Sequence, residues 1–128
     1  MRYSLLLHYP ELSADELGPD GAKQFEEATA AMDAYSKALD AAGVLISAEV
    51  LQRSSASTTL TLKDGAPVVQ DGPFADTKEQ LGGTFVLDVP DLDAALAWAE
   101  KCPALNWGAV ELRPTEIYFH DGAWTPSA

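Results

Sequence analysis

The chain is short of cysteine and of basic residues. Its one cysteine, Cys102, cannot form a disulfide within the chain, which favours a reducing compartment. Only 8 Lys and Arg stand against 20 Asp and Glu, so the formal net charge is −12, and no two basic residues are adjacent. Because such a surface repels nucleic-acid phosphates and anionic lipids, we expect neither nucleic acid nor a membrane surface as a partner.

Long apolar runs are also missing. No stretch approaches the ~20 apolar residues of a membrane-spanning helix, and the leucines at residues 5–7 lack the length and the cleavage site of a secretion signal. These absences favour a cytoplasmic protein. The length of 128 residues fits one domain, which we expect over residues 1–128 with a peripheral tail from about residue 119.

Residues that commonly ligate metals and cofactors are scarce as well. His8 and His120 are the only histidines, they lie far apart, and no Cys-x-x-Cys or His-x-x-x-His spacing occurs. The pair Gly82-Gly83 lacks the G-x-G-x-x-G and P-loop spacings that bind nucleotides. We therefore expect no cofactor and no metal. An oxygen-ligated Ca²⁺ or Mg²⁺ stays an open alternative, although there is no EF-hand loop.

Hydrophobic periodicity divides the chain into strands and helices. Apolar residues recur at every second position in several segments and at three- and four-residue steps in two others. Strands are expected at residues 2–9, 44–53, 57–63, 67–70, 84–89 and 109–118, and helices at residues 23–42 and 91–102. Asp91 is expected to be the N-cap of the second helix. Asp64-Gly65 marks a tight hairpin turn. Residues 71–83 are expected to be irregular, and residues 120–124 to form a final turn.

The resulting order, β-α-β-(hairpin)-β-α-β, is typical of the ferredoxin-like split βαβ fold. It predicts an α+β domain with an antiparallel sheet and both helices on one face of that sheet. Nothing in the chain then covers the other face. Because a bare sheet face usually acquires a partner, we expect a homodimer in which two open faces meet.

One segment is specific enough to suggest a family. The sequence DGPFADTKEQLGG at residues 71–83 closely resembles the signature of the YCII-related family, in particular its DGPF branch. Residues 91–99 and 108–114 agree with the same family, as does the opening strand. The resemblance implies a dimeric α/β-barrel.

For function the resemblance implies less. Some relatives in the wider group carry a His–Asp pair and are suspected enzymes, whereas members of the DGPF branch are often linked to alternative sigma factors. Residues 1–128 contain no segment that resembles a sigma-factor domain, so we do not expect that link to carry over directly.

Strand periodicity brings polar residues to the open face of the predicted sheet. If Val110 and Leu112 face the helices, Glu111 and Arg113 face the other way, and the same alternation places His8 on the open face of the first strand. In a ferredoxin-like sheet the first and last strands are neighbours. We therefore expect His8 and Arg113 to share a cleft that a dimer mate closes.

The candidate site residues each have two interpretations. His8 is a candidate general base whose ring Asp71 orients, since histidine exchanges protons near neutral pH; alternatively it is a half-buried strand histidine bonded to backbone. Glu111 and Arg113 can bind a polar ligand, with Arg113 gripping a carboxylate; alternatively they form an ion pair that stabilises the interface. Lys78 is a further candidate ligand-binding residue, or part of a solvated turn.

Other interpretations of these segments are structural. Asp71 also suits the turn at Gly72-Pro73, and Cys102 is expected in the core.

Two functions follow from these expectations. The first is a small-molecule-binding homodimer, with acid–base chemistry by His8 and Asp71 if the protein is an enzyme. The second is a non-enzymatic regulatory protein whose acidic surface docks a basic segment, for instance of a sigma factor, without binding DNA itself. A sheltered polar cleft favours the first, and an exposed polar face favours the second.

Overall fold

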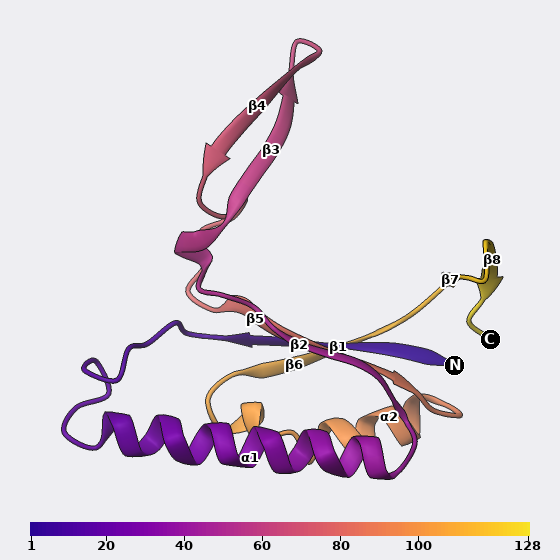
Figure 1. Cartoon of the computed structure of the whole chain (residues 1–128), viewed down its shortest axis with the longest axis horizontal. Helices are drawn as coiled ribbons and strands as arrows, with labels where there is room; N and C mark the ends of the chain where they lie inside the picture. The colour runs from indigo at the N-terminus through magenta and orange to yellow at the C-terminus, as the bar shows by residue number, and fades with distance from the viewer.

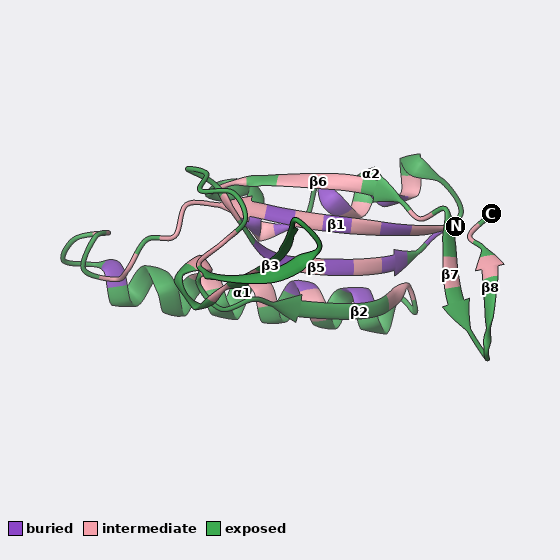
Figure 2. Ribbon diagram, turned by 90° about the horizontal axis from the view of Figure 1, so that it is seen from above, coloured by how far each residue is buried: buried purple, intermediate pink, exposed green.

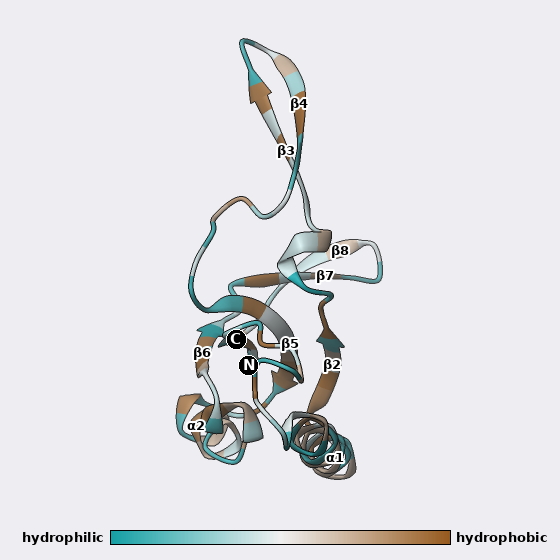
Figure 3. Ribbon diagram, turned by 90° about the vertical axis from the view of Figure 1, so that its left-hand side faces the viewer, coloured by the Kyte–Doolittle hydropathy of each residue, from teal (hydrophilic) through white to brown (hydrophobic).

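The computed structural model describes residues 1–128, and its centre is a four-stranded antiparallel sheet. The strand order is β2 (Leu45–Val50), β5 (Gln80–Asp88), β1 (Arg2–Tyr9), β6 (Ala109–Pro114). Helices α1 (Gly21–Ala41) and α2 (Leu92–Ala99) lie together on one face of this sheet (Figures 1 and 3). The predicted α+β, ferredoxin-like fold is therefore confirmed.

The core lies between the sheet and the two helices, as the strand alternation predicts. In β1 every second side chain is buried, and the side chains between them are half-buried (Figure 2). Antiparallel partners share a face, so Leu5 opposes Phe85 and Tyr3 opposes Leu87 in the core. The buried hydrophobic residues are Tyr3, Leu5, Leu7, Tyr35, Leu39, Phe85, Leu87, Val89, Ala95, Ala99, Cys102 and Ala104.

Local chemistry starts the second helix at the expected place. The Asp91 side chain accepts a hydrogen bond from the backbone N–H of Ala94 at 2.9 Å, which caps an otherwise unpaired donor and stabilises the helix by about 1 kcal/mol. Asp93 adds a negative charge in the first turn, where the helix dipole favours it.

Strand β5 begins four residues before the predicted strand, so Gly82 and Gly83 lie within the sheet and not in a loop. Close packing explains both glycines. A Cβ at Gly82 would overlap the Tyr9 ring, and a Cβ at Gly83 would lie 3.0 Å from the Glu49 carbonyl oxygen. Glycine has no side chain, so Gly82 and Gly83 interrupt the alternation of apolar residues by which a strand is recognised in a sequence.

Two hairpins extend from the sheet on the side away from the helices (Figures 1 and 3). The first joins β3 (Thr58–Lys63) and β4 (Ala66–Asp71) through Asp64 and Gly65, whose φ angles of 51° and 81° are those of the predicted tight turn. It follows a short 3₁₀ helix, η1 (Ser54–Ala56).

The C-terminal segment forms the second hairpin, where a single turn was predicted. Strands β7 (Ile117–His120) and β8 (Ala123–Pro126) pair across Asp121 and Gly122, which also have positive φ. This hairpin is tied to the start of β1. The backbone N–H of Arg2 donates to the Ser127 hydroxyl at 2.8 Å, and the Arg2 guanidinium lies 3.7 Å from the centre of the Tyr118 ring.

Neither helix combines the length and the apolar character needed to cross a membrane.

Candidate functional site

The face of the sheet away from the helices, called the open face below, carries the polar residues that the sequence placed there. Strands β1 and β6 are neighbours, with Ser4 opposite Arg113 and Leu6 opposite Glu111. His8 lies two residues beyond Leu6 on β1, and its side chain is therefore on the same face as Glu111. Val110 and Leu112 pack against the core on the other face, as predicted.

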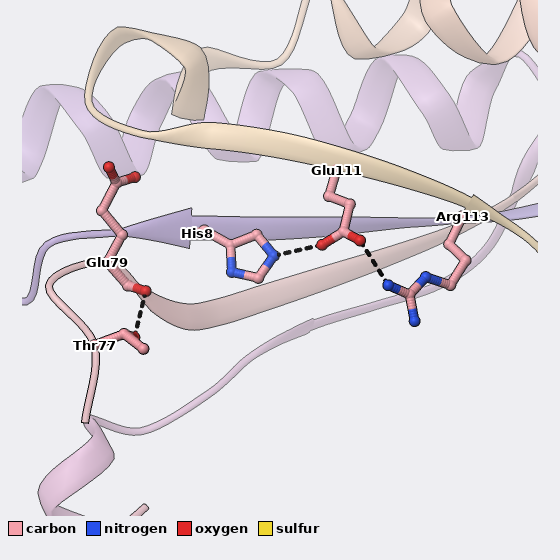
Figure 4. Close-up of polar contacts among 5 residues, drawn as sticks. All are labelled: His8, Thr77, Glu79, Glu111 and Arg113. Carbon is pink, nitrogen blue, oxygen red and sulfur yellow. Dashed lines mark hydrogen bonds and ion pairs between the residues drawn. The ribbon is translucent and has the colours of Figure 1, made fainter. Parts of the chain in front are cut away.

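A chain of three charged or titratable side chains crosses the open face (Figure 4). Nε2 of His8 lies 3.0 Å from Oε1 of Glu111, and the other carboxylate oxygen accepts a hydrogen bond of 2.7 Å from Nη2 of Arg113. Glu111 and Arg113 are two residues apart on β6, which places both side chains on one face. Glu111 therefore bridges a cation and an imidazole.

The Glu111 carboxylate selects which nitrogen of the neutral His8 ring carries the proton. Hydrogen bonds from Arg113 and then from His8 lower the pKa of the Glu111 carboxyl below its ordinary value. A carboxylate can only accept, so Nε2 of His8 donates to it and Nδ1 is the free acceptor of the neutral ring. A carboxylate that orients a histidine in this way is the usual support for a general base.

His8 also lies on the wall of a cleft of about 870 Å³, called the open-face cleft below. Its other walls are the segment that leads into β3 and the loop between β4 and β5. The lining residues are His8, Leu51, Gln52, Arg53, Ser54, Ala56, Ser57, Thr58, Thr59, Pro73, Phe74, Ala75, Thr77, Glu79, Gln80 and Leu81. This volume is in the range of small-molecule sites.

Glu11 anchors one wall of this cleft. Its carboxylate accepts a hydrogen bond from the backbone N–H of Ser54 at 2.6 Å and another from the Ser54 hydroxyl, while Nη2 of Arg53 donates to its carbonyl at 2.9 Å. The side-chain and then the backbone hydrogen bond of Ser54 lower the pKa of Glu11. The segment that follows β1 and η1 are thus held together by a charged group.

The opposite wall is held by hydrogen bonds within its own loop. The Thr77 hydroxyl donates to the Glu79 carbonyl at 2.8 Å (Figure 4), and the Gln80 amide donates to the carbonyls of Ala75 and Thr77 at 3.2 and 3.1 Å. Phe74, at 84% exposure, stands on this loop. Side chains of the segment at residues 71–83 therefore shape the loop, which gives the distinctive sequence there a structural role.

Comparison with known protein families matches most of the chain, including the segment at residues 71–83. The sequence model of the YCII-related domain matches residues 1–116. The chain belongs to the YCII-related family. The YCII-related region includes every strand of the central sheet and both helices, and it ends immediately before β7. His8, Glu111 and Arg113 all lie within it.

One curated relative matches about half of the chain. The protein named Uncharacterized protein R00369, from Rhizobium meliloti (strain 1021), is 42% identical to this YCII-related chain over 67 residues. Those residues are 51% of this chain and 54% of the relative. The match thus spans about half the length of that protein.

The five site residues predicted for this YCII-related chain fall into two groups. His8, Glu111 and Arg113 are brought together, and His8 also lines the open-face cleft. Asp71 ends β4 opposite Thr58, and Lys78 is exposed in the loop between Thr77 and Glu79. The carboxylate bonded to His8 belongs to Glu111 and not to Asp71.

Sequence reasoning missed Glu11, Thr77 and Gln80 as residues that shape the cleft. Glu11 contacts a residue 43 positions away, and no local pattern signals such a contact. For the loop a signal was present, since threonine and glutamine readily hydrogen-bond nearby carbonyls. No group of three or more His, Cys, Asp or Glu side chains is arranged to hold a metal ion.

Proposed function

We propose that this YCII-related protein is a homodimer that binds a small molecule in the open-face cleft, with His8 exchanging a proton with the bound molecule. The observation that carries the proposal is the Arg113–Glu111–His8 chain, which ends on the cleft wall. If the proton transfer is part of a reaction, the protein is an acid–base enzyme.

His8 is the group best placed for this role. Its hydrogen-bond partner is a side-chain carboxylate and not the backbone, and its side chain keeps 31% exposure, so solvent and ligand can reach it. Arg113 is occupied by Glu111, and we assign it a positioning role. Lys78 is the exposed cation next to two lining residues and would attract an anionic ligand, while Asp71 lies two residues before the lining residue Pro73.

The open face supports the homodimer part of the proposal. No helix covers it, and both hairpins rise on its side of the sheet (Figure 1). A two-stranded hairpin alone is marginally stable in water, so its apolar side chains need cover, which a second copy of the chain would supply. The most exposed of these side chains are Leu60, Leu62, Val69, Phe119 and Trp124, each at 59% exposure or more.

The acidic surface supports a second function, in which the protein docks a basic segment of a regulatory partner. The excess of 20 acidic over 8 basic residues supplies the charge, and electrostatic docking of this kind weakens steeply with salt. Loss of a basic partner above ~0.15 M salt would favour this function, whereas binding that persists there would favour the cleft.

The ring nitrogens of histidine provide a direct test. With only His8 and His120 in the chain, nitrogen-15 ring spectra report each histidine separately. We expect the His8 ring to carry its proton on Nε2 above neutral pH. Glu111→Gln should weaken the preference for that tautomer, because an amide can either accept from Nε2 or donate to it, and His120→Gln should leave it unchanged. A panel of small carboxylic acids, amines and neutral amides should include a class that shifts the His8 signals saturably.

Two results would contradict the proposal. One is a His8 ring whose spectra match those of the exposed His120 and do not respond to Glu111→Gln. The other is a monomer in sedimentation at micromolar concentration, which would leave the open face uncovered.

A further inference from the structure

A second cleft lies on the other side of the sheet, beneath the first half of α1. The two halves of this helix pack differently (Figure 2). In the second half Tyr35 and Leu39 are buried, and the Tyr35 ring meets the Phe85 ring edge to face at 5.4 Å between centroids. In the first half only Gly21 is buried, and Phe25 keeps 42% exposure.

Small residues leave this space empty. Gly83 occupies a position of β5 on the same face as the buried Phe85 and Leu87, where the strand would otherwise present another large side chain. Next to it β2 has Ala48 opposite Phe85, and α1 contributes Ala28. The result is a cleft of about 750 Å³, called the α1 cleft below, within the usual size of small-molecule sites.

Specific contacts hold the segment before α1 in place, and with it the wall of the cleft. Ser13 and Glu16 exchange hydrogen bonds between each backbone N–H and the other side chain, both at 3.2 Å. Gly21 packs so closely on Ala14 that a Cβ would overlap the Ala14 carbonyl oxygen. The Glu11–Ser54 contacts fix the far side.

The lining determines which molecules fit. Phe25, Phe85, Trp107 and the flexible Met32 offer aromatic and polarizable contact surface. The one basic lining residue, Arg53, already donates to the Glu11 carbonyl, while Glu11, Asp33 and Glu49 line the cleft as well. The lining therefore carries three carboxylates against one guanidinium, and an anionic ligand would meet net repulsion.

Tyr9 supplies a polar group on the wall. Its ring packs over Gly82, and its hydroxyl makes no hydrogen bond within the chain. Burial and the nearby Glu11 charge raise its pKa, so the hydroxyl keeps its proton at neutral pH and remains a donor.

We propose that the α1 cleft is a second binding site, which takes an uncharged molecule with an aromatic body and a hydrogen-bond acceptor for the Tyr9 hydroxyl. The site does not depend on the dimer or on His8. It shares residues 51–53 with the open-face cleft as a common wall.

The test uses prodan, an uncharged naphthalene ketone whose fluorescence changes in apolar surroundings. We expect saturable binding of one prodan per chain, with energy transfer from tryptophan. Ala28→Leu fills the cleft and should weaken binding by about tenfold or more. The matched control, Ala30→Leu, makes the same change at an exposed position of the same helix that does not line the cleft, and should bind as the wild type does.

Tyr9→Phe removes the donor and should weaken prodan binding by about fivefold. If circular dichroism shows that Ala28→Leu fails to fold, Phe25→Ala decides, because Phe25 is exposed enough to be replaced without loss of the core. The proposal is overturned if prodan does not bind saturably, or if it binds the cleft variants as tightly as Ala30→Leu. Prodan binding tests the α1 cleft and the His8 ring spectra test the open-face cleft, so either proposal can fail without the other.

Discussion

The two clefts differ in how their walls are made. The open-face cleft is bounded by polar side chains that hold backbone segments in place, with Glu11 on Ser54 and Gln80 on the loop carbonyls. The α1 cleft exists because side chains are small or absent, at Gly83, Ala48 and Ala28. One cleft depends on hydrogen-bond geometry, whereas the other depends on a deficit of side-chain volume. Substitutions should therefore act on them in different ways.

The largest effect on stability is expected from leucine substitutions that compare the packed core with the α1 cleft. Leu5 is fully buried, whereas Leu7, two residues along the same strand, borders the cleft. Leu5→Ala should lower the free energy of unfolding by about 4 kcal/mol, because the core around it cannot collapse to fill the cavity. Leu7→Ala should lower it by about 2 kcal/mol, because the space that it leaves opens onto the α1 cleft and is not a new closed cavity. Urea unfolding of both variants measures the difference.

Equal losses for Leu5→Ala and Leu7→Ala would mean that the α1 cleft is closed in solution. They would remove the distinction between a packed and an unpacked end of the core.

The next effect concerns the backbone beside His8. A Cβ at Gly108 would overlap the carbonyl oxygen of His8, and backbone cannot rotate away as a side chain can. Gly108→Ala should destabilise the fold by about 3 kcal/mol and displace the His8 ring from Glu111. Thermal unfolding gives the first quantity, and the nitrogen-15 ring spectrum of His8 gives the second.

Gly122→Asn is the matched control for this change. Gly122 has a φ of 77° and nothing within 4 Å of a Cβ, and asparagine tolerates that conformation at less than about 1 kcal/mol. The steric argument is wrong if both glycine variants unfold at the same temperature.

The sequence predicted the fold better than the clefts. Strand β1, the turn at Asp64-Gly65 and the Asp91 cap follow from local rules that need no partner, and all three are confirmed. Alternation along β6 also placed Glu111 on the open face with His8, since side-chain direction is a local property of a strand. That part of the candidate site could be predicted from the sequence.

Contacts between distant segments could not be predicted in the same way. Asp71 follows the predicted strand at residues 67–70 and Glu111 lies near the start of the one at residues 109–118, and only the register of β6 on β1 brings Glu111 to His8. Nothing in the sequence pattern indicated the α1 cleft, because Gly83 and Ala28 contribute to it only through their small volume. Such a lack becomes visible only when the facing elements are placed together.

A smaller effect is expected from Glu11, which stands on the wall between the clefts. Hydrogen bonds from Ser54 lower its pKa in the folded state, so its contribution to stability is present above the unfolded value of about 4.3. That contribution is lost as the pH falls through the lower, folded pKa. Because the group is largely solvated, we expect less than about 1 kcal/mol. Urea unfolding between pH 6 and pH 3 should show a flatter pH dependence for Glu11→Gln than for the wild type, and identical slopes would contradict the Glu11–Ser54 assignment.

We expect the smallest effect on stability from Arg113→Ala. This substitution is also the one most specific to the open-face cleft. The hydrogen bond from Arg113 is the largest cause of the lowered Glu111 pKa, so its removal should move that pKa up toward the ordinary value for a glutamate. The free energy of unfolding should stay within error, because exposed ion pairs contribute little. Carbon-13 titration of the Glu111 carboxyl measures the shift. Lys37→Ala is the control, since it removes another exposed ion pair, with Asp33 at 2.7 Å. An equal response of Glu111 to both variants would show that it senses total charge and not its contact with Arg113, and the positioning role would then be lost.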